Sequence, residues 1–249
     1  MRKLARRALT AIAATATAAA LTAAPAAADP VTYTIQNGGY LTGFNVGSFI
    51  GFGEINGATL ECTSSTITAW TRKDTSGNPI VNGTANGDGI ATLDNVTFSS
   101  PGQVNDWCVA NGTFPTQVTP LGLPWMFNAT GEGTSSGPGG TTDGRLTGVQ
   151  FKLHIEGWGL CDAIIGGPGA GGSDSYYEAT YYNPSTLTDN DGALDIPYLG
   201  SQNAKVLSIS DPEGCWMLSV GETFEFVGMY NLTRTTPNPP AAGISPTID

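Results

Sequence analysis

The chain has 249 residues, of which 12% are charged, against about 25% in an ordinary globular domain. Its first 28 residues hold four of the ten basic residues and no acid, so the rest carries six bases against 21 acids, a net charge of −15. A surface this acidic repels a phosphate backbone and therefore excludes nucleic acid as a partner. A single histidine and four cysteines also leave little material for metal sites.

The first 28 residues predict a secretory signal peptide. Residues 1–7 carry four positive charges, Ala8–Leu21 is apolar and rich in alanine, and Ala26-Ala27-Ala28 provides small residues for cleavage. The apolar run is shorter than the ~20 residues that span a bilayer, so we expect no membrane span after the signal is removed. We expect a mature chain that begins at Asp29 and is secreted, or held non-covalently at the cell envelope.

Residues 29–234 predict one all-β domain, an antiparallel β-sandwich or β-barrel. Short runs rich in Val, Ile, Thr, Phe and Tyr alternate along this segment with Gly, Asn, Asp and Pro. No stretch outside the signal has apolar residues at helical spacing, so we expect almost no helix. Residues 235–249 contain four prolines and no apolar alternation, which predicts a disordered tail.

Two segments alternate clearly enough to predict which face of a strand is buried. In Arg145–Ile155 we expect a single strand whose core face consists of Thr147, Val149, Phe151, Leu153 and Ile155. In Thr223–Thr233 we expect the core face to consist of Phe224, Phe226, Tyr230 and Leu232, with a close approach or a bulge at Gly228. Between Ile55 and Ala58, the pair Asn56-Gly57 predicts a two-residue hairpin turn.

The four cysteines predict two disulfide bonds, because the expected compartment is oxidising and no pair has the close spacing of a zinc site. Three pairings are possible, and we favour Cys62–Cys108 with Cys161–Cys215. These two bonds close loops of 46 and 54 residues.

No residue pattern identifies a catalytic, cofactor-binding or metal-binding residue. His154 is the single imidazole, and on the predicted strand it shares the water face with Lys152 and Glu156, which favours an ordinary surface position. A pair of carboxylates sufficient for glycoside hydrolysis can be neither supported nor excluded by counting acids. Asp189-Asn190-Asp191-Gly192 resembles a calcium loop at first, but the EF-hand register places Leu187 at the first ligand position, so a β turn is the better interpretation.

In residues 176–182, tyrosines occupy both even-numbered and odd-numbered positions. On a strand these positions face opposite sides, which predicts one set of rings in the core and the other lying across the sheet. Exposed rings of this kind also stack on sugars, so carbohydrate binding remains an alternative to a purely structural role.

Several short motifs occur in a fixed order along the chain. They are Leu123–Ala129, Gly144–Val149, Gly159–Cys161, Thr180–Asn183, Gly214-Cys215, Gly221–Phe224 and Gly228–Tyr230. Their order and the cysteine positions resemble a family of small, uncharacterised secreted proteins of actinobacteria. The resemblance covers about residues 58–233 and implies export, an all-β fold and two disulfides, with no activity or catalytic residue to carry over.

The sequence therefore favours a non-enzymatic secreted or envelope-associated β protein without a cofactor, in a structural or binding role. We expect a partner, where there is one, to be a glycan or a protein of the cell envelope. Two alternatives stay open, a carboxylate-dependent hydrolase that acts on glycans and a secreted inhibitor or signal that binds another protein.

Overall fold

The computed structural model describes residues 31–132, 137–157, 159–198, 201–235 and 243–249. The predicted signal peptide therefore lies outside the described residues. Within them, regular structure consists of strands and two short 3₁₀ turns, η1 (Val104–Asp106) and η2 (Ala170–Gly172). The described residues contain no helix that is long and apolar enough to cross a membrane.

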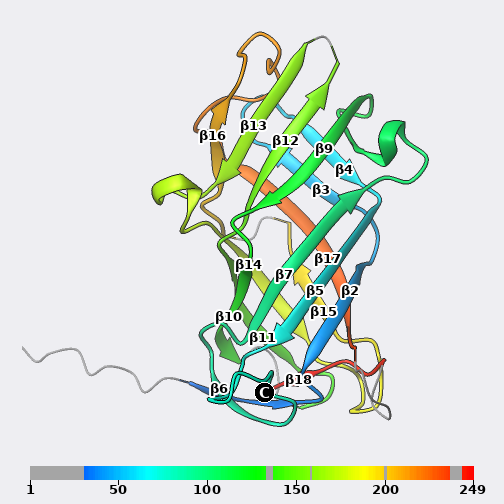
Figure 1. The fold of residues 1–249 in the computed structure, drawn as a ribbon, viewed down its shortest axis with the longest axis vertical. Coiled ribbons are helices and arrows are strands. Elements are labelled where there is room, and N and C mark those ends of the chain that lie inside the picture. The colour runs from blue at the N-terminus through cyan, green and yellow to red at the C-terminus, as the bar shows by residue number, and fades with distance from the viewer. Residues whose placement is uncertain (1–30, 133–136, 158, 199–200, 236–242) are drawn as a thin grey trace, which may run out of the picture.

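Eight antiparallel strands form a closed barrel, which we call the main barrel (Figure 1). The barrel closes because β15 pairs with β14 on one side and with β17 on the other. Its strands are β2 (Tyr40–Asn45), β5 (Ser64–Thr71), β7 (Ala91–Ser99), β10 (Trp125–Glu132), β11 (Thr141–Thr147), β14 (Tyr176–Tyr182), β15 (Ala193–Ile196) and β17 (Phe224–Arg234).

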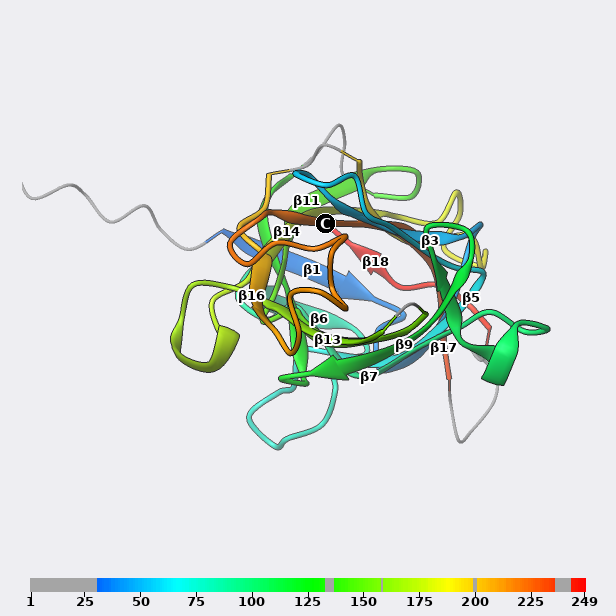
Figure 2. The same cartoon turned by 90° about the horizontal axis from the view of Figure 1, so that it is seen from above.

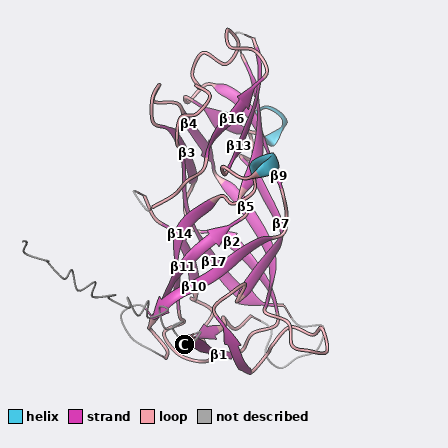
Figure 3. Cartoon of the chain, turned by 90° about the vertical axis from the view of Figure 1, so that its left-hand side faces the viewer, coloured by secondary structure: helices cyan, strands magenta, loops and turns pink. Residues whose placement is uncertain are grey.

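A second set of strands, the distal sheet, is stacked on the main barrel along the long axis of the molecule (Figures 1 and 3). It consists of β3 (Phe49–Gly53), β4 (Thr59–Cys62), β8 (Cys108–Ala110), β9 (Phe114–Leu121), β12 (Gln150–Glu156), β13 (Leu160–Gly166) and β16 (Lys205–Ile209). Strand β17 belongs to both parts, because its first half pairs with β3 and its second half with β2. The distal sheet curls back toward the start of β17 through a bridge between Lys205 and Thr223.

A small third sheet covers the end of the main barrel that lies away from the distal sheet (Figures 1 and 2). It consists of β1 (Thr32–Gln36), β6 (Gly83–Asn86) and β18 (Thr247–Ile248). The expectation of a disordered tail is wrong for residues 243–249, because Ile248 is buried and pairs with Ile35 of β1. An open barrel end exposes apolar side chains to water. Covering them buries apolar surface, and this burial stabilises the position of the segment.

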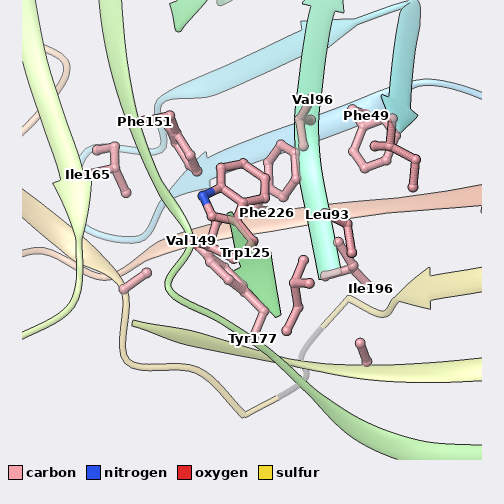
Figure 4. Close-up of a cluster of buried hydrophobic side chains, with 14 of the residues drawn as sticks. Phe49, Leu93, Val96, Trp125, Val149, Phe151, Ile165, Tyr177, Ile196 and Phe226 are labelled. Atoms are coloured by element: carbon pink, nitrogen blue, oxygen red, sulfur yellow. The ribbon is translucent and has the colours of Figure 1, made fainter. Parts of the chain in front are cut away.

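The hydrophobic core runs through the junction of the main barrel and the distal sheet (Figure 4). Phe226 of β17 packs there against Phe151 of the distal sheet and Tyr177 of the main barrel, with Trp125 beside them. The Tyr177 hydroxyl donates to the Phe224 carbonyl at 2.8 Å, and burial, with a smaller contribution from the charge of Glu225, raises the pKa of Tyr177 far above its ordinary value. The phenol therefore stays neutral and serves the core as a hydrogen-bond donor.

The expected strand Arg145–Ile155 is two strands. Gly148, with φ of 76°, interrupts the strand where the chain passes from β11 in the main barrel to β12 in the distal sheet, and on β11 the buried residue is Leu146 instead of Thr147. Beyond Gly148 the prediction is correct, since Phe151, Leu153 and Ile155 are buried.

The predicted core face of β17 is confirmed at all four positions. A Cβ atom at Gly228 would lie 2.1 Å from the Phe49 ring, which explains why glycine is needed there. Strand β14 likewise buries Tyr177 and Tyr181 and turns Tyr176 and Tyr182 outward, as the tyrosine pattern predicts.

The two disulfides join Cys62 to Cys108 and Cys161 to Cys215, the pairing that the sequence favours. Both lie in the distal sheet or in the loop that follows it. They therefore cross-link the distal sheet and not the main barrel.

Candidate functional site

His154 lies on the outer face of β12, as predicted, but it is not an isolated surface residue. Its Nδ1 lies 2.7 Å from Oδ1 of Asp162, the residue directly opposite on β13, and its ring meets the Trp107 ring edge-on at 5.7 Å. Lys152 Nζ lies 3.0 Å from the other Asp162 oxygen. No serine, threonine or cysteine hydroxyl or thiol among the described residues hydrogen-bonds to His154, so this histidine and aspartate lack the nucleophile of a catalytic triad.

We expect Asp162 to give the protein a measurable share of its acid stability. Hydrogen bonds from His154, and then from Lys152, hold the pKa of Asp162 below its ordinary value of 3.8. A carboxyl whose pKa is lower in the folded state stabilises the protein above its unfolded pKa, and this contribution is lost as the pH falls through the folded pKa. Between about pH 5 and 2, unfolding free energy measured in urea is therefore expected to fall less steeply for Asp162→Asn than for the wild type.

Because the Asp162 side chain is 39% exposed, water screens this contribution and we expect it to stay small. Glu54→Gln, which changes an exposed acid in the β3–β4 turn, serves as the control and should follow the wild-type curve. Parallel curves for the wild type and Asp162→Asn would contradict the assignment.

The segment Asp189–Gly192 is a loop with a bend at Asn190, and the hydrogen-bonded turn lies just before it, where the Asp189 amide donates to the Thr186 carbonyl at 3.2 Å. The Ser185 hydroxyl lies 2.7 Å from Asp189 Oδ2 and 2.8 Å from Asp191 Oδ2. Its contact with Asp191, together with the hydrogen bond from the Ser185 amide, lowers the pKa of Asp191. Among the described residues no group of three or more histidine, cysteine or acidic side chains is placed to hold a metal ion. The predicted β turn is therefore displaced toward the N-terminus, to residues 186–189, and the Asp189 and Asp191 side chains accept hydrogen bonds from Ser185.

The strongest candidate for ligand binding is a hollow on the outer face of the main barrel, which we call the Trp70 hollow. It has a volume of about 440 Å³ and lies where β5, β7 and β10 run side by side. It is lined by Trp70, Arg72, Lys73, Asp88, Gly89, Thr92, Met126 and Asn128. The hollow thus combines one large aromatic ring with charged, hydroxyl and amide groups in a shallow, open depression.

The register of the barrel strands aligns the apolar groups of this hollow with Tyr40, which lies beside it on β2. Tyr40 lies opposite Trp70, Trp70 opposite Thr92, and Thr92 opposite Met126. All four side chains point outward, because the residues beside them on each strand are buried. Neighbouring strands lie about 4.8 Å apart, so Tyr40, Trp70 and Met126 form a row that crosses four strands.

The polar groups of the hollow are held in place by contacts with the turn that precedes β7. The Arg72 guanidinium donates to the Asn86 side chain and to the Asp88 carbonyl. The Asn128 side-chain oxygen accepts from the Gly89 amide at 2.7 Å, while its amide group donates to Thr147 at 2.7 Å. Preformed donors and acceptors of this kind lose little entropy when a ligand binds.

The hollow also concentrates positive charge in an acidic protein. Arg72 and Lys73 are two of the six basic residues that follow residue 28. The Lys73 ammonium lies 4.6 Å from the centre of the Trp70 ring. A cation–π contact at an exposed site contributes only about 0.5–1 kcal/mol, so a ligand that stacks on the ring can displace it.

A second groove, of about 490 Å³, lies on β11 and β14 and contains two carboxylates. Asp143 and Glu178 both line it, with Arg145 directly opposite Glu178 in the strand register. Each carboxylate already accepts a hydrogen bond, Asp143 from the Thr180 hydroxyl at 3.0 Å and Glu178 from the Ser201 amide at 2.9 Å.

The sequence analysis did not single out the residues of the Trp70 hollow. A usable signal is present in Trp70-Thr71-Arg72-Lys73, where an aromatic residue at a strand end precedes two of the few cations. Met126 and Asn128 carry no such signal, because only the pairing of β7 with β10 brings them beside Trp70. Comparison of the chain with models of protein families, with curated sequences and with solved structures gave no match.

Proposed function

We propose that this chain is an exported, non-enzymatic β-barrel protein that binds carbohydrate in the Trp70 hollow. A sugar ring has an apolar C–H face and a rim of hydroxyls, so it needs an aromatic surface bordered by donors and acceptors. The single observation that carries the proposal is the placement of Trp70 beside Arg72, Asp88 and Asn128 in one hollow. The row of Tyr40, Trp70 and Met126 is long enough for several sugar units, so it favours a linear oligosaccharide that crosses the strands and not a single monosaccharide.

The expected result is that Trp70→Ala weakens oligosaccharide binding at least about tenfold, which corresponds to about 1.4 kcal/mol. The loss follows because the ring is the largest apolar surface in the hollow. The measurement is a glycan array of neutral and carboxylated oligosaccharides, followed by isothermal titration of the best ligand.

Phe44→Ala is the matched control, because Phe44 is an exposed ring on β2 that lies opposite Thr66, outside the hollow. This variant should bind as the wild type does. Absence of any glycan ligand, or equal affinity in Trp70→Ala, would refute the proposal.

A carboxylate-dependent glycan hydrolase is the second candidate, because Asp143 and Glu178 line one groove. They are diagonal neighbours on paired strands, which places their Cα atoms about 7–8 Å apart, within reach of the spacing of an inverting pair. The same oligosaccharides distinguish the two functions. Release of reducing sugar that disappears in both Asp143→Asn and Glu178→Gln, and survives in Trp70→Ala, would favour the hydrolase.

A further inference from the structure

Four large apolar side chains are exposed on loops at the end of the distal sheet, far from the third sheet (Figures 1 and 3). We call this surface the apolar tip. It consists of Ile55, Leu160, Trp216 and Val220, each between 58% and 68% exposed. They come from three segments, the β3–β4 turn, the start of β13 and the loop between β16 and β17.

Direct contacts bring these three segments together. Asn56 Nδ2 donates to Ser219 Oγ at 2.8 Å, which joins the turn of Ile55 to the loop of Val220. The disulfide between Cys161 and Cys215 joins the neighbours of Leu160 and Trp216 in the sequence. A Cβ atom at Gly214 would lie 2.8 Å from the Leu160 carbonyl oxygen, so the two segments touch there.

A buried carboxylate fixes the shape of the tip. Glu222 is 1% exposed, and it accepts hydrogen bonds from the backbone amides of Ile55 at 3.1 Å and Ser219 at 2.5 Å. The turn at Asn56-Gly57 is correspondingly longer than the two residues predicted, running from Glu54 to Ala58, with positive φ at Gly57 and not at Asn56. A rigid loop that holds apolar side chains in water is preorganised for contact with a partner.

The charge around the tip restricts what that partner is. Glu54, Asp211 and Glu213 are exposed in the same segments. Residues 53–58, 157–161 and 210–222 contain no lysine or arginine. Anionic bilayers repel such a rim, whereas a basic protein surface complements it.

We propose that the apolar tip docks a basic protein surface that offers an apolar pocket to Trp216. Tryptophan is one of the residue types enriched at the energetic hot spots of protein interfaces, and the acidic rim steers a cationic partner toward it. This docking is independent of carbohydrate binding, because the Trp70 hollow lies on the main barrel.

The test uses a phage-displayed random peptide library, selected on the oxidised full chain after depletion on Trp216→Ser. We expect the selected peptides to combine lysine or arginine with leucine, phenylalanine or tryptophan. Made synthetically, they should bind Trp216→Ser at least about tenfold more weakly than the wild type. Glu213→Gln and a rise in salt to about 0.5 M should each weaken binding several-fold.

Val104→Ser is the matched control, because Val104 is 58% exposed in η1, which both views place away from the β16–β17 loop (Figures 1 and 2). It should bind the peptides as the wild type does. Selection of peptides without basic residues, or of none that depend on Trp216, would overturn the proposal. Trp216-dependent sedimentation with phosphatidylcholine vesicles, or Trp216-dependent dimerisation in analytical ultracentrifugation, would overturn it in favour of a lipid surface or a second copy.

Discussion

Replacing Phe226 by alanine is expected to lower the free energy of unfolding by about 4 kcal/mol, within the range for a deeply buried phenylalanine. The side chain is 3% exposed and belongs to the strand that the main barrel and the distal sheet share. Its ring centre lies 5.1, 5.3, 5.5 and 6.2 Å from those of Phe49, Phe98, Phe151 and Tyr177. Removing it leaves a cavity among rings that sheet pairing holds in place, so the site collapses poorly.

The measurement is guanidinium unfolding of the oxidised protein, followed by tryptophan fluorescence and circular dichroism. Because the main barrel and the distal sheet share this core, the unfolding midpoints from fluorescence and from circular dichroism should move together to lower guanidinium concentration in Phe226→Ala. Phe44→Ala, which removes an exposed ring, should change stability by no more than about 0.5 kcal/mol. A loss below about 1.5 kcal/mol in Phe226→Ala would contradict the role of the junction as the common core.

Truncation after residue 242 is expected to cost about 4 kcal/mol or more, although it removes only seven residues. The segment accepts hydrogen bonds from three buried side chains: Thr142 and Asn183 donate to the Ile248 carbonyl at 2.7 and 2.9 Å, and Tyr181 to the Pro246 carbonyl at 2.6 Å. A donor left buried without a partner costs about 1–3 kcal/mol, which applies to Thr142 and Tyr181, whereas Asn183 keeps its bond to the Gly137 carbonyl at 3.1 Å. The loss of Ile248 also uncovers Ile35.

Thermal and guanidinium unfolding check this result. The conservative control, Ile248→Val, should lower the free energy of unfolding by only about 1 kcal/mol. Ile248→Ala should lower the free energy of unfolding by about 3 kcal/mol, between the truncation and Ile248→Val. This variant provides the test if the truncated chain does not accumulate. A truncated protein as stable as the full chain would show that residues 243–249 are not needed to cover the end of the main barrel.

Part of the fold could be predicted because strand alternation is a local property. Phe151, Leu153 and Ile155 must share one face of any extended segment, and the same holds for the four core positions of β17. The break at Gly148 was not predicted, because Thr147 and Val149 continue the alternation at every second residue. Threonine, however, is as common on the outer face of a strand as on the inner face. Only the positive φ of Gly148 separates the two strands.

The candidate site could not be predicted in the same way, since its residues come from separate strands. Trp70, Asp88 and Met126 meet because β5, β7 and β10 pair in one register, and a shift of a single residue would turn Met126 into the core. The row of Tyr40, Trp70 and Met126 is therefore a product of strand pairing. No local pattern encodes it.

The sequence by itself determined the all-β class and the net charge of −15 after residue 28, and it favoured the cysteine pairing that the structure has, because these depend on composition, local periodicity and the order of residues along the chain. Tertiary structure alone decided the choice of a closed barrel over a sandwich, the sharing of β17 by two parts, and the use of residues 243–249 to cover a barrel end. The physical reason is that barrel closure depends on non-local register and on apolar surface that exists only once the strands have paired. A segment with four prolines at 235–249 gives no local sign that Ile248 is needed at that distant opening.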